Sequence, residues 1–301
     1  MKKILITGAY GQDGIILSKL LKSKNYKVYG IIKKRDKNKG VKGIFYLKCN
    51  LNDFKKINKI IKDLKPNCIV HLGSENPSYK ELKKKKDFYY KNLIVIKNLV
   101  NSILLNNKKI KFIFPGSSQM YGNKKKRVNE NEKFSPVNSY AKFRVDGHNF
   151  LMRYKKKHNL LITTVILFNH DSMYRNKKFI IPRLINAIKN NNVKFIKSMF
   201  RLNICVDFSH AEVICNEIYL LIKSKANLNK IILSSNHLTN LNDIIMYLLK
   251  LLKINLSFNY KLIQKKNIIG NNYLARKILN WKIKKNIFIA SEELLKKTFK
   301  I

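Results

Sequence analysis

Short apolar runs alternate with longer amphipathic segments through the first half of the chain. The apolar runs are bounded by turn residues and charges, as is typical of buried strands, and they occupy residues 2–7, 26–32, 43–49, 67–73, 108–114 and 160–168. The segments between them place apolar residues on one helical face and occupy residues 7–25, 53–65, 88–105 and 140–157. This alternation predicts a parallel sheet with helices on both faces.

The regular alternation weakens after about Phe168. Helical periodicity continues with fewer strands between the helices, in residues 180–190, 210–223 and 241–252. We therefore expect an α/β fold with a doubly wound parallel sheet over residues 1–168 and a smaller, mostly helical C-terminal domain over residues 169–301. Some later segments are expected to return to the first domain. No Pro- or Ser-rich linker separates the two parts.

Composition indicates a globular cytoplasmic protein. The chain has 301 residues, of which 45% are hydrophobic, with only 11 Gly and 5 Pro, so it can bury a substantial core. No apolar run is long enough for a secretion signal or a membrane span, so no membrane partner is expected. The four cysteines show no CxxC or CxxH spacing. That scatter argues against a bound metal and against a disulfide framework.

The chain carries a large positive charge. Lysine and arginine number 63 against 17 acidic residues, a formal net charge of +46. A charge of this size is compatible with a nucleic-acid partner, but the lysines are spread through every segment and no nucleic-acid motif accompanies them. We therefore expect no nucleic-acid partner. The positive field favours an anionic substrate instead.

A glycine-rich loop stands between the first strand and the first helix. In TGAYGQDG, Gly8, Gly11 and Gly14 permit a tight turn and a close approach of the backbone to a pyrophosphate, while the helix N-terminus offers N–H groups to the anion. Its position at the first strand-to-helix junction predicts a Rossmann-type dinucleotide site. Residues 1–168 are thus the expected NAD(P)-binding domain and residues 169–301 mainly the substrate-binding domain.

A basic cluster follows the second strand. Lys33, Lys34 and Arg35 stand near the place where an NAD-binding chain carries an acid for the ribose 2′-hydroxyl. Basic residues there suit a 2′-phosphate, so NADP is the favoured cofactor. NAD stays possible, because Asp36 becomes the ribose-binding acid if the strand ends a few residues later.

Further motifs extend this pattern along the chain. They are PGSSQMYG (Pro115 to Gly122), SYAKFR around Tyr140, FNHDSMYRNKKFIIPRL (Phe168 to Leu184), DFSHAEVICNEI (Asp207 to Ile218) and NNYLARKILNW (Asn271 to Trp281). Together with TGAYGQDG, they resemble the extended short-chain dehydrogenase/reductase family, the NAD-dependent epimerases and dehydratases of nucleotide sugars. Within it, the chain is most similar to the GDP-mannose 4,6-dehydratase branch, whose motifs occur in the same order.

The resemblance implies both a chemistry and a cofactor site. Tyr140 would remove the 4-hydroxyl proton of a hexose while NADP takes the hydride, and Ser117 would bind the same oxygen. A cation four residues after the tyrosine lies on the same helical face and favours the tyrosinate; the family has lysine there, and this chain has Arg144. The cofactor residues implied are Gly8, Gly11, Gln12, Asp13, Gly14, Lys34, Arg35, Asn50, Leu51, Tyr140 and Arg144.

One departure from the branch concerns the base for the dehydration step. The branch has Glu at the position of Gln119, where it removes the C5 proton, and an amide cannot accept that proton. Glu75, in HLGSEN, stands where the branch has Gln. Relative to the branch, Glu and Gln are thus exchanged between the loops that contain residues 75 and 119. This exchange makes Glu75 the candidate base.

The substrate contacts carry over unevenly. Asn169 and Arg183 match residues suited to hydroxyl and diphosphate groups, but the arginine that precedes the Asp207 motif in the branch is Val206 here. A GDP-linked sugar is the expected substrate, and family members form homodimers or larger homo-oligomers.

Three functions stay open on the sequence. They are a nucleotide-sugar 4,6-dehydratase (a lyase), an NADP-dependent 4-reductase or epimerase without the dehydration step, and a non-catalytic homologue that binds NADP or a sugar nucleotide. Loss of water from the substrate separates the first from the second, and cofactor turnover separates both from the third.

Overall fold

The chain folds into two compact units. A computed structural model describes residues 1–36, 40–74, 88–124, 126–258, 263–282 and 285–301. Unit 1 is formed by segments of residues 1–122, 133–166 and 215–231, and unit 2 by segments of residues 123–132, 167–214 and 232–301. Because segments of each unit alternate along the chain, both units are assembled from distant parts of the sequence.

A seven-stranded sheet runs through unit 1 in the order β10-β7-β5-β4-β1-β2-β3. The strands are β1 (Lys3–Thr7), β2 (Lys27–Ile32), β3 (Phe45–Lys48), β4 (Cys68–His71), β5 (Lys111–Ser117), β7 (Ile162–Leu167) and β10 (Lys230–Leu233). Strand β1 pairs in parallel with both β2 and β4, so the strand order reverses beside β1. Ligands of doubly wound sheets bind at such a reversal. The Rossmann-type fold expected from the sequence is confirmed.

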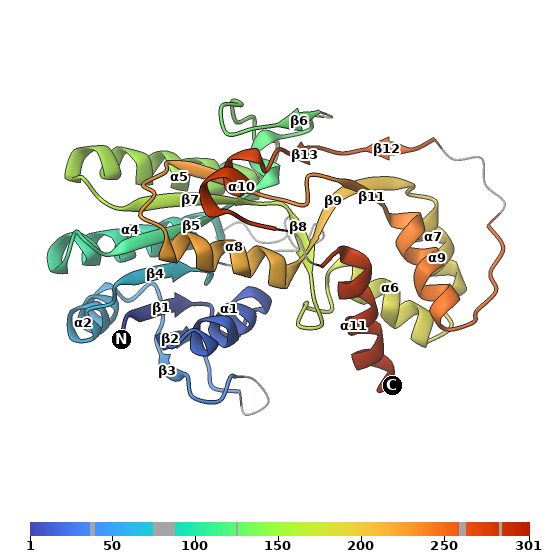
Figure 1. Ribbon diagram of the computed structural model, residues 1–301, viewed down its shortest axis with the longest axis horizontal. Coiled ribbons are helices and arrows are strands. Elements are labelled where there is room, and N and C mark those ends of the chain that lie inside the picture. The colour runs from blue at the N-terminus through green and yellow to red at the C-terminus, as the bar shows by residue number, and fades with distance from the viewer. Residues whose placement is uncertain (37–39, 75–87, 125, 259–262, 283–284) are drawn as a thin grey trace. The chain divides into compact units, whose positions relative to one another are not determined.

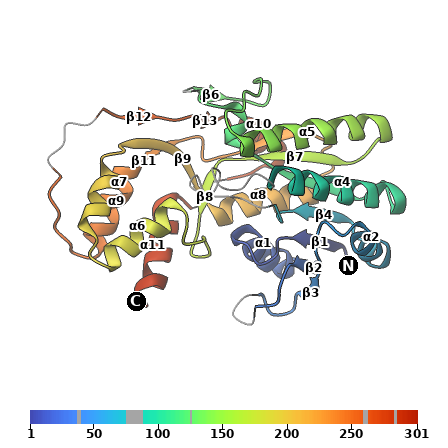
Figure 2. The ribbon, with the colours of Figure 1, turned by 180° about the vertical axis from the view of Figure 1, so that it is seen from behind.

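Helices cover both faces of this sheet (Figure 1). They are α1 (Gln12–Ser23), α2 (Phe54–Leu64), α4 (Phe88–Asn106), α5 (Ser139–His158) and α8 (Ala211–Lys223). Helices α4 and α5 pack side by side, as Figure 2 shows from behind. Their apolar faces join the strands in one buried cluster that includes Phe112, Phe114 and Phe143. This cluster fixes the start of α5 against the end of β5.

Unit 2 is built around strand β9 (Ile204–His210). Strand β11 (Leu238–Asn240) pairs antiparallel with β9, and β12 (Lys265–Lys266) and β8 (Asn169–Asp171) pair with it in parallel. A separate pair joins β13 (Ile269–Gly270) to β6 (Arg127–Val128). The helices are α6 (Ile180–Lys189), α7 (Val193–Phe200), α9 (Leu241–Leu251), α10 (Tyr273–Leu279) and α11 (Ile287–Phe299). The sequence analysis predicts none of these strands. Most of them have only two or three residues, which carry too little alternation to detect.

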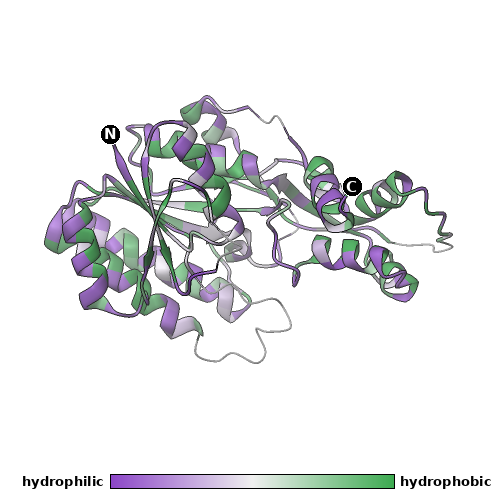
Figure 3. Cartoon of the chain, turned by 90° about the horizontal axis from the view of Figure 1, so that it is seen from below, coloured by the Kyte–Doolittle hydropathy of each residue, from purple (hydrophilic) through white to green (hydrophobic). Residues whose placement is uncertain are grey.

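The helices are amphipathic rather than uniformly apolar. Figure 3 shows hydrophilic and hydrophobic residues alternating around them, and the buried positions of α6 are its apolar ones, such as Ile181, Leu184 and Ile185. Within the described ranges, no helix combines the length and the apolar character that a membrane crossing requires.

Candidate active site

The glycine loop between β1 and α1 is closely packed. Gly8 has φ +70°, and a Cβ atom there would lie 2.7 Å from the backbone of Gly73 at the end of β4. A Cβ atom on Gly14 would lie 2.5 Å from the Gly8 carbonyl oxygen. No side chain caps α1 at Gly11. The loop therefore brings bare backbone and a helix N-terminus together, which suits a phosphate group.

A cleft of about 450 Å³ opens beside this loop. Its lining comes from the ends of β1, β2, β3 and β4 and the start of α4, and comprises Gly8, Ala9, Tyr10, Gly11, Ile31, Ile32, Lys33, Lys34, Cys49, Asn50, Leu51, Asn52, Gly73, Lys91, Asn92 and Val95. The volume suits a nucleotide-sized ligand. The tight loop, the uncapped helix and the cleft together fit a dinucleotide cofactor.

The cleft contains only some of the expected cofactor residues. Gly8, Gly11, Lys34, Asn50 and Leu51 line it. Gln12, Asp13 and Gly14 lie in the first turn of α1, and Arg35 is exposed just beyond β2. Two residues of α4 that sequence reasoning missed, Lys91 and Asn92, also line the cleft. They belong to no motif, so only the packing of α4 reveals them.

Tyr140 and Arg144 lie on one face at the start of α5, as the spacing predicts. Asn138 caps the helix by accepting a hydrogen bond from the Ala141 N–H at 2.8 Å. The guanidinium carbon of Arg144 lies 5.1 Å from the centre of the Tyr140 ring. Tyr140 is 7% exposed and Arg144 is 4% exposed. This distance is within the range of a cation–π contact between the guanidinium and the ring.

The Arg144 guanidinium is held from two sides. Its Nη1 atom donates to the Pro115 carbonyl oxygen at 2.7 Å and, more weakly, to the Ser74 hydroxyl at 3.4 Å. The aromatic rings of Phe143 and Phe114 lie 4.9 and 5.7 Å from its central carbon. Within the described part of the chain, the ion pairs found leave Arg144 without a carboxylate partner. Its charge is therefore available to Tyr140.

Ser117 and Gln119 lie where β5 runs into a short 3₁₀ helix, η1 (Ser118–Tyr121). The Ser117 hydroxyl accepts a hydrogen bond from the Gln119 N–H at 3.3 Å. The Gln119 side chain is exposed, and its Oε1 atom accepts from Asn138 Nδ2 at 3.0 Å. Because Asn138 uses its own oxygen as the α5 cap, it has only N–H groups to offer Gln119. Gln119 is thus left with its NH₂ group for a ligand. Glu75, the candidate base, lies outside the described residues.

A buried histidine lies behind the site. His71 is fully buried at the end of β4. Its Nδ1 atom lies 2.8 Å from Thr7 Oγ1, and its Nε2 atom lies 3.2 Å from Ser74 Oγ. Burial, and secondarily the charge of Arg144, lowers the His71 pKa to about 3. The ring is therefore neutral at physiological pH.

The low pKa of His71 predicts an acid-sensitive fold. Unfolding exposes the ring, which then takes up a proton at any pH between about 3 and its ordinary pKa of 6.5. The stabilisation is complete above pH 6.5 and is lost as pH falls, at up to about 1.4 kcal/mol per pH unit. Urea unfolding of wild type and of His71→Gln between about pH 7 and pH 5 measures this contribution. Equal pH slopes for the two proteins would contradict it.

The expected substrate residues lie in unit 2. Asn169 begins β8 and is exposed. Arg183 lies on α6, with its guanidinium carbon 4.8 Å from the centre of the Phe195 ring. Val206 lies on β9 and joins the hydrophobic core of the unit. Its side chain is thus used for packing, so the branch's arginine has no counterpart at this position.

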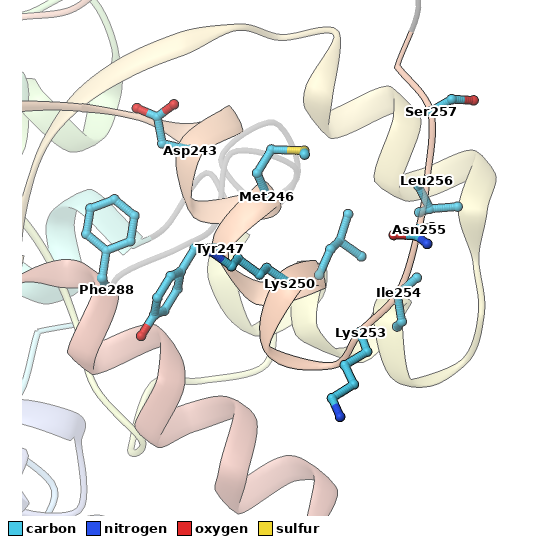
Figure 4. Close-up of a pocket in the computed structure, with 11 residues that line it drawn as sticks. Asp243, Met246, Tyr247, Lys250, Lys253, Ile254, Asn255, Leu256, Ser257 and Phe288 are labelled. Atoms are coloured by element: carbon cyan, nitrogen blue, oxygen red, sulfur yellow. The ribbon is translucent and has the colours of Figure 1, made fainter.

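Unit 2 also contains a larger cavity of about 1040 Å³, formed by α9, the segment after it and the start of α11 (Figure 4). Apolar side chains such as Met246, Ile254, Leu256 and Phe288 line it, with Lys250 and Lys253 from the end of α9 and the turn after it. The lining includes no residue expected from the sequence to bind or react.

Comparison with known proteins decides the family. The model of the family described as GDP-mannose 4,6 dehydratase matches residues 5–294. The chain belongs to the GDP-mannose 4,6-dehydratase family. Similar relatives include GDP-mannose 4,6 dehydratase 1 of Arabidopsis thaliana, 25% identical over 67% of this chain and 61% of the relative, and GDP-mannose 4,6-dehydratase of Yersinia enterocolitica, 26% identical over 63% and 55%.

The matched region spans about three fifths of these relatives, 61% and 55% of their lengths. Solved structures agree on the fold. The dTDP-glucose 4,6-dehydratase of Bacillus anthracis, in complex with NAD, has a TM-score of 0.83 at 16% identity and covers 100% of this chain and 97% of that one. The UDP-glucose 4-epimerase of Thermotoga maritima, with UDP-glucose, has the same TM-score of 0.83 at 15% identity and covers 99% of each chain.

Proposed function

We propose that the chain is a nucleotide-sugar 4,6-dehydratase of the GDP-mannose type that uses NADP. The observation that carries the proposal is the family match across residues 5–294. It is supported by unit 1, which places the buried Arg144 guanidinium against the Tyr140 ring. It is also supported by a cleft with bare glycine backbone, which fits a dinucleotide.

The residues of unit 1 divide the oxidation step between them. When bound, NADP would accept the hydride from C4 of the hexose and return it after water has left. Tyr140 takes the proton of the 4-hydroxyl, and Ser117 binds the same oxygen. The positive charge of Arg144 favours the tyrosinate that this transfer requires. The glycine loop and the start of α1 hold the pyrophosphate.

Water elimination requires a second base. A carboxylate must take the C5 proton, and the carboxylic acid so formed can give a proton to the 6-hydroxyl, which then departs as water. The amide of Gln119 cannot take the C5 proton. We assign this role to Glu75 on the sequence alone. Asn169 and Arg183 are the proposed contacts to the hydroxyl and diphosphate groups of a GDP-linked sugar.

The proposed function is tested by measuring the mass of the products formed from nucleotide sugars. Purified protein is incubated with NADP and with GDP-, UDP- and dTDP-hexoses, and the products are weighed by mass spectrometry. A GDP-sugar product lighter by one water supports the proposal. A UDP- or dTDP-sugar product lighter by one water would move the substrate class, and conversion without water loss would remove the dehydratase assignment.

NADP preference is expected to depend on the lysines after β2. Lys33 and Lys34 line the cleft and can pair with a 2′-phosphate, an interaction that NAD lacks. Replacing both with Ser is expected to weaken NADP binding about tenfold or more, since one such charged contact is worth about 1.5–3 kcal/mol, and to leave NAD binding nearly unchanged. Calorimetric titration with each dinucleotide measures the difference. The exposed Lys142→Ser change on α5 is the control, and equal losses for NADP and NAD would contradict the assignment.

One observation favours a second function. Gln119 presents an NH₂ group because Asn138 Nδ2 already donates to its oxygen. A donor at this position can bind a carbonyl or hydroxyl oxygen but cannot remove a C–H proton. A 4-reductase or 4-epimerase of a nucleotide sugar requires only Tyr140, Ser117 and NADP. Reduction of a supplied 4-keto sugar by NADPH, without water loss, would select this function.

A further inference from the structure

One side chain, Asn138, joins the element that contains Gln119 to the helix that contains Tyr140. The Oδ1 atom of Asn138 accepts a hydrogen bond from the Ala141 N–H at 2.8 Å and so caps α5, the helix of Tyr140. The Nδ2 atom of the same side chain donates to Gln119 Oε1 at 3.0 Å. The two ends of one amide therefore hold the start of α5 and the side chain of Gln119.

The capping bond decides which way both amides face. A backbone N–H can only donate, so the atom of Asn138 that faces Ala141 is its oxygen. The other end of the Asn138 amide is then its NH₂ group, and only an acceptor can face that group. The Gln119 oxygen is therefore turned toward Asn138, and the Gln119 NH₂ group is turned away from it.

The backbone around Gln119 is held in a way that keeps this orientation. Ser117 caps η1 by accepting a hydrogen bond from the Gln119 N–H at 3.3 Å. The Ser135 N–H donates to the Met120 carbonyl oxygen at 2.8 Å, which ties η1 to the segment before α5. Gly122 ends η1 with φ +72°, and a Cβ atom there would overlap the Ser135 carbonyl oxygen. Backbone contacts therefore hold the two amides within reach of each other.

We propose that Asn138 is a positioning residue that fixes residue 119 as a hydrogen-bond donor toward the sugar, so that the Gln119 NH₂ group binds an oxygen of the hexose. The inference rests on the proposed function, since it takes a nucleotide sugar to be bound beside Ser117 and Tyr140. A group that is oriented before the ligand arrives loses less conformational freedom on binding. Without Asn138, the amide of Gln119 could rotate and present its oxygen to the sugar instead.

Asn138→Asp reverses the orientation and keeps the helix cap. Aspartate caps a helix N-terminus about as well as asparagine, but its second oxygen can only accept, so the Gln119 NH₂ group turns toward position 138 and its oxygen toward the sugar. The value of kcat/KM at saturating NADP is expected to fall about tenfold or more. Asn138→Ser keeps the cap and is too short to reach Gln119, so a smaller loss of about threefold is expected.

A double-mutant cycle separates the orientation of the amide from the added negative charge. In Gln119→Met, residue 119 has no polar group for position 138 to orient. Adding Asn138→Asp to this background is expected to lower kcat/KM by less than about twofold, and that loss measures the effect of the charge near Tyr140. An equal loss on adding Asn138→Asp to wild type and to Gln119→Met would overturn the inference.

A spectroscopic measurement tests the orientation without any substrate. The chain contains three glutamines, Gln12, Gln119 and Gln264. The Gln119 side-chain NH₂ signals of protein labelled with ¹⁵N-glutamine are therefore identified as those that Gln119→Met removes. In Asn138→Asp, one hydrogen of this NH₂ group is expected to shift downfield and to exchange more slowly with water, because it then donates to a carboxylate. Gln119 signals that match those of wild type would overturn the proposed orientation.

Failure of the inference can be distinguished from failure of the proposed function. If the Gln119 signals shift as expected but kcat/KM does not fall in Asn138→Asp, the contact between Gln119 and the sugar is wrong and the proposed function stands. If the wild-type protein turns over no nucleotide sugar, the proposed function fails and the inference fails with it. Melting curves of all variants show whether each of them is folded.

Discussion

Tyr140→Phe is expected to lower the rate of nucleotide-sugar turnover by about 10²- to 10⁴-fold, the usual contribution of a positioned general base. Phenylalanine keeps the ring that packs 5.1 Å from the Arg144 guanidinium and removes only the hydroxyl. The change therefore tests proton transfer rather than packing. The measurement is product formation by mass spectrometry, together with the exchange of hydride between NADP and the sugar.

The matched control for this loss is another tyrosine of the same unit. Tyr90, on α4, is 70% exposed, and Tyr90→Phe is expected to turn over substrate as wild type does. NADP affinity is expected to be unchanged in Tyr90→Phe. Because Tyr140 is also one of the expected cofactor residues, turnover of both variants is measured at saturating NADP, so that a weaker cofactor affinity does not account for the loss. A Tyr140→Phe protein that keeps wild-type turnover would remove Tyr140 from the mechanism.

The fold of unit 1 could be predicted because most of its strands, though not the edge strand β3, are buried on both faces. Strands such as β4, whose four residues are all buried, read as apolar runs, and α2 between β3 and β4 has a strongly one-sided apolar face. In unit 2, the sequence analysis does not predict β9. Six of its seven residues are buried, but three of these are the polar residues Asp207, Ser209 and His210, so the strand does not read as an apolar run. Its partners β11 and β12 are too short to be recognised, because pairing with β9 rather than local pattern defines them.

The candidate site could be predicted in part. Gly8, Gly11 and Tyr140 belong to motifs whose spacing reflects a turn or a helical face. The contacts of Arg144 could not be predicted, since they depend on Pro115, which is 29 residues away, and on Ser74, which is 70 residues away. Likewise, the orientation of the Gln119 amide depends on Asn138, whose cap on α5 is a property of the folded helix.

Exchanging Glu75 and Gln119 is expected to move the base for dehydration from position 75 to position 119. Glu75→Gln is expected to lower the rate of water loss by about 10²- to 10⁴-fold, because an amide cannot take the C5 proton, while hydride transfer at C4 continues. In the Glu75→Gln background, Gln119→Glu is expected to restore water loss. The measurement is the fraction of product lighter by one water, with deuterium at C4 reporting hydride transfer.

The geometry around Gln119 supports the expected rescue. Asn138 Nδ2 already donates to the side-chain oxygen at this position, and it can donate to a carboxylate in the same way, so the new base is held in place. The exposed side chain of Gln119 is open to a ligand.

Gln119→Asn in the Glu75→Gln background is the control and is expected to stay inactive in water loss. Water loss that persists in Glu75→Gln alone would exclude Glu75 as the base. Rescue by Gln119→Glu can be observed only if Glu75→Gln has first lost water elimination. The two variants together therefore show which of the two loops carries the base.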